Sequence, residues 1–326
     1  MKKKIAVVGG GPAGLEVSRL LLKKGYEVHV YERLEELGGL YIFGVPDWRI
    51  DKSRIKERIK EIKELGLIAH TGIEVGRDVD LEELINSYDA VILATGAWKP
   101  KLVRWEGVEL RGVIHAFDYL TKLNLVNHGY LKEDELIKAV GKTFVVGGGD
   151  VAIDAAMEAR KEGAEVTILY RRSEAEMPCN KEEIEVVKNE GIKILCLTNV
   201  KKFVGEEGRL KKIIAIKMRL GEPDESGRPK PIPIEGSEFE LEADTCILAT
   251  GEIPTPPFED EKYGIKLSSK GNVIVDGKWR TTRKGVFAIG DLATGPLNFG
   301  SAVRSAIECA DSVEEYLETG EWTNEK

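Results

Sequence analysis

The chain has 326 residues, of which 42% are hydrophobic and 32% charged, and its formal net charge is −8. This composition is typical of a globular protein with about two domains, and it excludes a disordered chain. No apolar run approaches the ~20 residues that cross a bilayer, and no basic stripe indicates a nucleic-acid binder. The first residues, MKKKIAVVG, lack the length and cleavage pattern of a signal peptide, so we expect a cytoplasmic protein.

Cysteine and histidine are sparse, which limits the chemistry open to this chain. The four cysteines form no C-x-x-C pair, which argues against a redox dithiol, a zinc site and an iron–sulfur cluster within the chain. The four histidines offer little for a catalytic triad, so we expect neither a metal site nor a catalytic side chain. The absence of glutamine, with abundant Lys and Glu, favours a thermophilic source.

The 35 glycines are clustered, and the clusters repeat within the chain. Residues 5–14 read IAVVGGGPAG and residues 143–152 read TFVVGGGDVA. Each segment is a short apolar run, typical of a buried parallel strand, followed by a glycine turn and a helical pattern. The pentapeptide ILATG ends a later strand in each half, at 92–96 and 247–251. The chain therefore contains two βαβ modules in the same internal order.

The first glycine turn has the spacing of a dinucleotide-binding motif, with Gly9, Gly11 and Gly14 before a helix predicted over residues 14–24. The first glycine permits the tight turn, the second lets the backbone approach a pyrophosphate, and the third packs helix on strand. Glu32 ends the next strand, where a carboxylate can accept hydrogen bonds from ribose hydroxyls. Further cofactor contacts are expected from Pro12, Ala13 and Arg33.

The second copy carries Gly147, Gly149 and Ala152 but has Arg171 and Arg172 after its second strand instead of an acid. Guanidinium groups pair with phosphate oxygens bidentately, so this copy favours a ribose with a 2′-phosphate, that is NADP(H) over NAD(H). The first copy suits FAD, and a chain with both sites would pass a hydride between the two rings. Further contacts of the second site are expected from Asp150 and Val151.

A plainer interpretation of the two arginines remains open. Arg171 and Arg172 could belong to a solvated surface loop, with Glu174 or Glu176 as their ion-pair partners.

With these motifs in place, the chain resembles two-dinucleotide-binding-domain flavoproteins, specifically the small (beta) subunit of glutamate synthase and its relatives. The YRR, EMP and GEPD segments are more specific than either glycine turn. The matching stretches are VGGGPAG at 8–14, GGL at 38–40, GVP at 44–46 with Arg49, VVGGGDVAID at 145–154, YRR at 170–172, EMP at 176–178, LGEPDESGR at 220–228, GVFAIGD at 285–291 and TGP at 294–296.

The resemblance implies roles that spacing alone does not assign. It implies that Asp291, after Gly290, binds the ribityl chain of FAD, although an Asp there also suits an N-cap. It implies that a helix over 298–316 directs its N-terminus at the flavin pyrimidine, stabilising negative charge on the reduced ring. The other implied cofactor contacts are Gly38, Gly39, Leu40, Arg49, Val75, Ala94, Thr95, Gly96, Thr250, Gly251, Gly300 and Ser301.

Two features depart from the resemblance. Relatives commonly carry a cysteine-rich N-terminal domain with iron–sulfur clusters, whereas this chain begins at the first strand. Relatives also usually have Asn after the second glycine triplet, where this chain has Asp150. A carboxylate so near the phosphates is mildly unfavourable for NADP(H) binding.

The expected fold is α/β, with two Rossmann-like dinucleotide-binding domains and the second inserted into the first. We expect a discontinuous FAD domain at residues 1–121 and 253–326, because Asp291 must return to the first nucleotide, and an NADP(H) domain at residues 122–252. Residues 221–236, rich in proline and charge, predict a long hairpin loop. Residues 52–63 predict a charged helix whose isoleucines share one face.

The leading functional hypothesis is an electron-input subunit that takes hydride from NADPH onto FAD at the domain junction. It would pass electrons to a partner that carries iron–sulfur clusters or to a glutamate synthase large subunit. One alternative is a stand-alone NAD(P)H reductase of a ferredoxin-type or diffusible acceptor. Another is a flavin-holding, non-catalytic subunit of a larger dehydrogenase, which the intact second site argues against.

Overall fold

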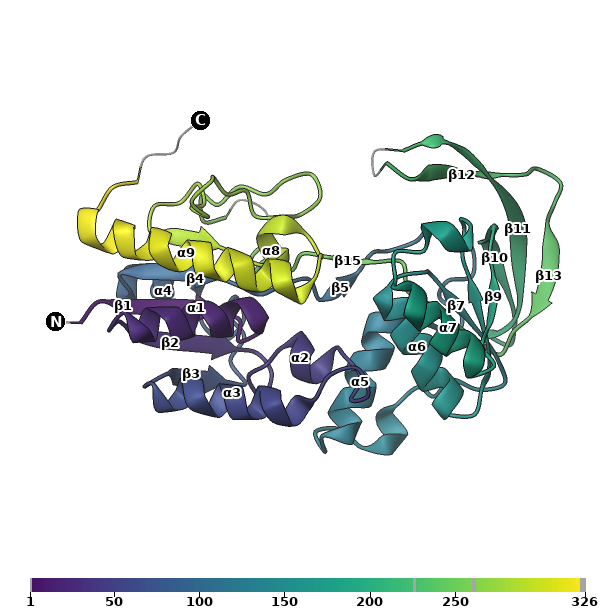
Figure 1. Cartoon of the computed structure of the whole chain (residues 1–326), viewed down its shortest axis with the longest axis horizontal. Helices are drawn as coiled ribbons and strands as arrows, with labels where there is room; N and C mark the ends of the chain where they lie inside the picture. Colours follow the sequence, from purple (N-terminus) through teal and green to yellow (C-terminus); the bar gives the residue numbers. More distant parts are fainter. Residues whose placement is uncertain (1, 225–226, 260–261, 323–326) are drawn as a thin grey trace. The chain divides into compact units, whose positions relative to one another are not determined.

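A computed structural model describes residues 2–224, 227–259 and 262–322 of the chain (Figure 1). The chain forms two compact units, one from Met1–Lys99 with Glu252–Lys326 and one from Pro100–Gly251. The sequence prediction set the first boundary after residue 121, about 20 residues too late. A short two-stranded pairing of β5 (Lys99–Pro100) with β15 (Glu252–Ile253) marks the two crossings.

The first unit is built on a parallel sheet in the order β16-β4-β1-β2-β3. In the central pair, Val7 and Val8 of β1 lie in register with Val30 and Tyr31 of β2. These strands are short β-branched runs, and their alternate residues are buried on both faces, as a covered parallel sheet requires. The strands are β1 (Lys4–Val8), β2 (Glu27–Glu32), β3 (Ile68–Thr71), β4 (Ala90–Leu93) and β16 (Val286–Ala288).

Helices α1, α3 and α9 cover one face of this sheet, and their apolar residues form one buried cluster with the strands (Figure 1). The charged helix predicted over 52–63 is confirmed as α3, and Ile59 and Ile62 are its buried residues in that cluster. Helix α4 and residues 263–275 pack on the opposite face. The helices are α1 (Pro12–Lys23), α2 (Leu40–Phe43), α3 (Lys52–Glu64), α4 (Leu81–Ser87), α8 (Asp291–Thr294) and α9 (Phe299–Thr319).

The second unit repeats this plan with a parallel sheet in the order β6-β14-β7-β8-β9. Helices α5, α6 and α7 pack against one face. The strands are β6 (Val113–His115), β7 (Lys142–Val146), β8 (Glu165–Leu169), β9 (Lys193–Leu195) and β14 (Thr245–Leu248), and the helices are α5 (Ala116–Asn127), α6 (Asp150–Lys161) and α7 (Lys181–Asn189). The predicted boundary is corrected because β6 pairs with β14, more than 100 residues away in sequence, which draws residues 100–121 into this unit.

An antiparallel sheet covers the other face of the second unit, and its apolar residues pack against β7, β8 and β14. Its long strand β11 pairs with β10, β12 and β13. The segment 221–236, predicted as a long hairpin loop, contains the end of β11 and all of β12, so half of it is strand, and residues 225–226 lie outside the described part of the chain. The strands are β10 (Thr198–Glu206), β11 (Arg209–Pro223), β12 (Pro229–Pro233) and β13 (Phe239–Glu242).

The predicted fold class is confirmed, because each unit has the parallel strand–turn–helix core of a dinucleotide-binding domain.

Candidate nucleotide-binding sites

The first glycine turn lies between β1 and α1 and is closely packed beneath. Gly9 has φ +108°, and a Cβ atom there would overlap the backbone carbonyl of Ala94. A Cβ on Gly14 would overlap the carbonyl oxygen of Gly9 itself. Each glycine is therefore required by a backbone approach that a side chain would block.

The N-terminus of α1 is free of the groups that usually cap a helix. Gly11 is its N-cap residue and has no capping side chain, Pro12 opens the helix, and the first turn contains no acid. Unpaired N–H groups at such a helix start attract phosphate. The residues present therefore fit a pyrophosphate, and Pro12 and Ala13 are placed where the sequence analysis expected them.

Glu32 lies at the end of β2 and points back at the glycine turn. Its side chain is 5% exposed. Its Oε2 atom accepts a hydrogen bond from the Gly10 N–H at 2.7 Å, and its Oε1 atom accepts one from the Leu34 N–H at 2.9 Å. Burial raises the pKa of the Glu32 carboxyl. Each oxygen keeps a second lone pair, so the carboxylate can also accept a hydrogen bond from a ribose hydroxyl.

Residues 38–40 lie directly against the same turn. The Gly38 N–H donates to the Gly10 carbonyl at 2.8 Å, and a Cβ on Gly39 would lie 2.7 Å from the Gly11 Cα atom. Helix α2 begins at Leu40. Gly39 and Leu40 are thus brought to the predicted site by backbone packing, as the sequence analysis expected.

Two further residues implied by the resemblance have clear local surroundings. The Arg49 guanidinium lies over the Trp48 ring, 4.9 Å from its centroid. Val75 is 6% exposed and packs in the apolar cluster of α4, and its backbone bridges to Val79. The Val75 side chain is therefore a core residue, so a cofactor contact there would involve the backbone.

The segment after β16 returns to the first glycine turn. Gly290 has φ +62°, and a Cβ there would lie 3.1 Å from the Ala13 Cβ atom. The Gly290 N–H donates to the Ser305 hydroxyl of α9 at 2.9 Å. Asp291 opens α8, its Oδ1 atom accepts a hydrogen bond from the Leu297 N–H at 3.4 Å, and burial raises the pKa of its carboxyl. Asp291 thus follows a residue that packs against Ala13 at the first turn, and its contact with a ribityl chain stays a prediction.

The start of α9 is capped by Asn298, which the sequence analysis gave as the beginning of this helix without assigning it a capping role. Its side-chain oxygen accepts hydrogen bonds from the Ser301 N–H at 2.9 Å and from the Ser301 hydroxyl at 3.2 Å. Two Ser301 donors are thus used within the chain, whereas Gly300 contributes only backbone. Asn just before a helix is a recognised N-cap signal, so the sequence contained the information needed to find it.

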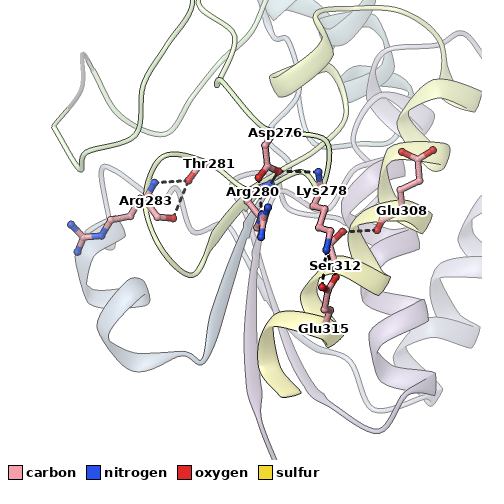
Figure 2. Close-up of polar contacts among 8 residues, drawn as sticks. All are labelled: Asp276, Lys278, Arg280, Thr281, Arg283, Glu308, Ser312 and Glu315. Atoms are coloured by element: carbon pink, nitrogen blue, oxygen red, sulfur yellow. Dashed lines mark hydrogen bonds and ion pairs between the residues drawn. The ribbon is translucent and has the colours of Figure 1, made fainter. Parts of the chain in front are cut away.

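The turn at residues 276–283 holds α9 against the sheet (Figure 2). Lys278 Nζ contacts both carboxylate oxygens of Glu315 at 2.7 and 2.8 Å. Within the turn, the buried Arg280 pairs with Asp276 at 2.7 Å. Because the Gly290 N–H also donates to the Ser305 hydroxyl of α9, the helix is held at two points along its length.

The first ILATG segment, which ends in Ala94, Thr95 and Gly96, is fastened to residue 255. The Ala94 N–H donates to the Val8 carbonyl at 2.7 Å. The Thr95 hydroxyl donates to the Thr255 carbonyl at 2.6 Å, and the Thr255 N–H donates to the Gly96 carbonyl at 2.9 Å.

Two predicted site residues, Arg33 and Gly251, make contacts within or next to the ILATG segments. The Arg33 guanidinium lies over the Trp98 ring, 4.6 Å from its centroid. In the second ILATG segment, Gly251 has φ +96° and its carbonyl accepts a hydrogen bond from the Lys101 N–H at 2.8 Å.

The second glycine turn, between β7 and α6, repeats the geometry of the first. A Cβ on Gly147 would overlap the Ala249 carbonyl, and Gly149 is the uncapped N-cap residue of α6. Ala152 is buried at the position of the third glycine, whereas Asp150 lies exposed in the first helical turn, with Val151 half-buried beside it. The residues present fit a second pyrophosphate, with one acid close to it.

Tyr170 follows β8 and was noted in the sequence only as part of the YRR motif. A Cβ on Gly148 would lie 2.6 Å from its ring, and the Tyr170 hydroxyl donates to the Glu176 carbonyl at 2.6 Å. Tyr170 therefore packs under the glycine turn and anchors the EMP segment.

Arg171 and Arg172 have different surroundings. The Arg171 side chain is exposed, whereas Arg172 is 2% exposed and forms an ion pair with Asp224 at 2.6 Å. Its partner is thus neither Glu174 nor Glu176, which the solvated-loop interpretation would have required. Glu176 instead accepts a hydrogen bond from the Ser173 N–H at 3.0 Å.

The four cysteines form no disulfide bond, and burial raises the pKa of Cys246 and Cys309. Within residues 2–224, 227–259 and 262–322, no three His, Cys, Asp or Glu side chains gather as metal ligands. In the same described ranges, no helix combines the length and apolar character of a membrane span.

Residues 3–306 match the family model for pyridine nucleotide-disulphide oxidoreductases. The chain is 36% identical to the glutamate synthase [NADPH] small chain of Azospirillum brasilense, over 96% of this chain and 66% of the relative. It is 37% identical to the NADP(+)-dependent formate dehydrogenase subunit beta of Moorella thermoacetica, over 98% of this chain and 44% of that protein. The predicted resemblance to the glutamate synthase small subunit is confirmed, although the chain spans less than two thirds of either relative.

The fold is similar to that of Mycobacterium tuberculosis FprA, solved in complex with NADPH. The TM-score is 0.85 at 20% sequence identity, and the match covers 98% of this chain and 85% of FprA. At this identity the likeness supports the fold.

Proposed function

The chain belongs to the pyridine nucleotide-disulphide oxidoreductase family, and from this premise we propose that it is a flavoprotein that takes hydride from NADPH onto FAD. The observation that carries the proposal is the pair of glycine turns with different side chains beside them. Glu32 faces the first turn, whereas Arg171 and Arg172 follow the strand beside the second. Two turns of one design with opposite charges nearby suit two different dinucleotides.

We assign FAD to the unit of residues 1–99 and 252–326. Its turn is completed by residues 38–40 and by Gly290 with Asp291, which meet around the start of α1. The uncapped helix start suits the pyrophosphate, and the buried Glu32 and half-buried Asp291 carboxyls suit sugar and ribityl hydroxyls. We assign NADP(H) to the unit of residues 100–251, where Gly147, Gly149 and Arg171 provide the corresponding contacts.

The chain's own residues bind and orient in this mechanism, and the bound flavin supplies the hydride-accepting ring. The glycine turns hold the phosphates close to the backbone, and Asp291 holds the sugar-alcohol chain. The partial positive charge at the start of α9 favours negative charge near it. Hydride transfer needs close placement of two rings and no protein acid or base, which agrees with the shortage of histidine.

We propose that the electrons leave toward a protein partner carrying iron–sulfur clusters or toward a glutamate synthase large subunit. The proteins similar to this chain include a glutamate synthase small chain and a formate dehydrogenase beta subunit, both named as subunits or chains of larger enzymes. We further propose a cytoplasmic location, since four cysteines that form no disulfide bond fit a reducing compartment.

An anaerobic titration of the purified flavoprotein with NADPH and with NADH tests the proposal. We expect NADPH to bleach the flavin at lower concentration than NADH does. Failure of NADPH to bleach the flavin would overturn the enzyme assignment in favour of a flavin-holding subunit. A preference for NADH would overturn the assignment of NADP(H) alone. Co-purification with an iron–sulfur protein would separate a subunit from a stand-alone reductase.

A further inference from the structure

Two histidines and two tyrosines form a ring cluster on the α4 side of the first sheet. The His29 Nδ1 and His70 Nε2 atoms lie 3.1 Å apart, within hydrogen-bond distance, and the two rings are nearly parallel. His70 also stacks on Tyr31, with 4.5 Å between the ring centroids, and the Tyr31 and Tyr88 hydroxyls lie 2.8 Å apart. The cluster thus joins β2 to β3, the last strand at one edge of this sheet, and to the residue after α4.

The hydrogen bond between the two imidazoles limits how many protons the pair can hold. A neutral imidazole has one donor nitrogen and one acceptor nitrogen, whereas an imidazolium has two donors. After one added proton, one of the two facing nitrogens still has a lone pair, so the bond remains. A second added proton puts a hydrogen on both facing nitrogens and brings two positive charges together, so the bond breaks.

The first added proton has a carboxylate to stabilise it. The Glu27 Oε1 atom lies 3.1 Å from His29 Nε2, which is the ring nitrogen that His70 does not use. The hydrogen bond to His29 and the nearby Lys4 lower the pKa of Glu27, so this carboxyl is ionised at neutral pH. Lys4 Nζ lies 3.3 Å from the same oxygen, and its charge offsets part of the carboxylate. One shared carboxylate therefore supports one imidazolium.

The surroundings of His70 oppose a second proton. Burial and the neighbouring His29 lower the pKa of His70. Burial raises the pKa of Tyr88, so its hydroxyl stays neutral and supplies no negative charge. Asp89, the residue after Tyr88, is engaged by Lys3 at 3.0 Å. The second proton therefore meets a half-buried site beside a positive charge.

Strand β3 leads into the segment that packs against the end of β2. The Gly72 N–H donates to the Leu34 carbonyl at 3.0 Å, and the Ile73 N–H donates to the Glu32 carbonyl at 3.0 Å. Val75, whose backbone is expected to contact adenine, follows two residues later. A change in how β3 is held would therefore reach the Glu32 end of the proposed FAD site.

We propose that the His29–His70 hydrogen bond is an acid-sensitive clasp, which holds β3 on β2 until both imidazoles are protonated and which on opening speeds the release of FAD. The release of FAD rests on the proposed function, whereas the clasp is a property of this chain's own residues. The unfolded chain takes up the second proton more readily than the folded pair does. The stabilisation by the clasp is therefore present above the ordinary histidine pKa of about 6.5 and is lost as the pH falls below it.

Imidazole NMR of the purified holoprotein tests the clasp directly, because the chain has four histidines and each gives its own signal. We expect one histidine of the pair to take up a proton near the ordinary histidine pKa and the other only at lower pH. At that lower pH the β3 amides should also lose protection from hydrogen exchange. Two imidazoles that both titrate near about pH 6.5, while β3 stays protected, would overturn the inference and leave the FAD assignment intact.

The variant His70→Gln keeps the bond and loses the titration. Its amide can donate to His29 Nδ1 or, after rotation, accept from it, and it takes up no proton in this range. Flavin fluorescence follows the rate of FAD release as the holoprotein is moved from about pH 7.5 to about pH 5.5. We expect the wild type to accelerate about tenfold more than His70→Gln, the factor that one pKa unit gives. The matched control is His128→Gln, which removes a histidine of the second unit and should follow the wild type.

Three results would count against these assignments, and they differ in what they overturn. Equal acceleration of the wild type and His70→Gln would overturn the inference alone. Loss of the acceleration in His128→Gln would place the acid sensitivity outside the pair and would also overturn it. A purified chain that contains no FAD would overturn the proposed function, and the imidazole titration would still decide whether the clasp exists.

Discussion

The two glycine turns differ less in backbone than in what packs against them. The Gly9 N–H donates to Tyr31, and the Gly147 N–H donates in the same way to Leu169. Tyr31 and Leu169 are therefore equivalent positions, and the residues that follow them are Glu32 and Tyr170. Glu32 thus corresponds to Tyr170 and not to Arg171. A comparison of Glu32 with Arg171 by sequence alone is out of step by one residue.

At equivalent positions, the two turns are lined by different side chains. In the first unit the Glu32 carboxylate bonds the Gly10 N–H, so a polar group lines the turn. In the second unit the Tyr170 ring fills that space against Gly148. The next position is Arg33 in one unit, stacked on Trp98, and Arg171 in the other, exposed beside the hairpin tip. We therefore expect the nucleotide preference of each site to depend on the elements packed around a shared backbone.

The largest expected difference between the turns is at their third position, where Gly14 corresponds to Ala152. A Cβ on Gly14 would overlap the Gly9 carbonyl, so Gly14→Ala must push α1 away from β1. We expect a loss of about 3 kcal/mol in the free energy of unfolding and loss of bound flavin. Denaturant unfolding monitored by circular dichroism, together with the flavin content of the purified protein, measures both effects.

The reciprocal change provides the control. Ala152→Gly removes a buried methyl group from a helix and should cost about 1 kcal/mol with flavin content unchanged. If Gly14→Ala costs no more than Ala152→Gly, the two turns do not differ in packing.

The next effect concerns the ion pair between Arg172 and Asp224 in the second unit. Asp224→Ala leaves the Arg172 guanidinium buried without its ion-pair partner. Breaking a fully buried pair costs roughly 3–5 kcal/mol, and because the Asp224 side chain is 30% exposed we expect about 2 kcal/mol. Glu222→Ala, an exposed acid on the same hairpin, should be close to neutral. Equal melting temperatures for the two variants would contradict a structural role for the pair.

A smaller effect is expected in the pH dependence of folding stability, through Glu32 of the first turn. Burial raises the pKa of Glu32 in the folded chain. Its contribution to stability is therefore complete below the unfolded pKa and is lost as the pH rises through the raised folded pKa.

The test compares Glu32→Gln with the wild type, both without flavin. Relative to the variant, the wild type should lose a few degrees of melting temperature as the pH rises from about 4 to about 8. Glu35→Gln, an exposed neighbour, should show no such trend. A difference between Glu32→Gln and the wild type that stays constant with pH would show that burial does not control this carboxyl.

Local patterns in the sequence were sufficient for the strand–turn–helix cores. The two turns share one spacing, with glycine at the first and second positions and Gly14 or Ala152 at the third. The backbone contacts that require glycine lie at the turn itself or at the neighbouring ILATG segment. The Asn298 cap could also have been predicted, because its bonds reach only three residues along the chain.

The remainder depends on pairings between distant segments. Nothing near β6 indicates that it adds to β14, and this pairing sets the boundary after Lys99. The Arg172–Asp224 pair spans 52 residues, so it cannot be predicted from the YRR motif. The motif alone suggests two phosphate ligands, whereas the structure shows an exposed Arg171 and a buried Arg172 that is ion-paired with Asp224. A side chain that contacts a turn from a distant part of the sequence produces no periodic pattern from which the contact could be predicted.

The smallest expected effect concerns the start of the two turn helices, where Pro12 corresponds to Asp150. Asp150 is exposed in the first turn of α6, a position where the helix dipole favours a carboxylate. The same charge repels a pyrophosphate bound there. Asp150→Asn should therefore tighten NADPH binding about threefold, equivalent to roughly 0.7 kcal/mol, and lower the melting temperature slightly. Calorimetric titration with NADPH at two salt concentrations measures the gain, which should shrink at high salt because exposed charges are screened. Weaker binding by Asp150→Asn would instead mean that Asp150 accepts a hydrogen bond from the nucleotide.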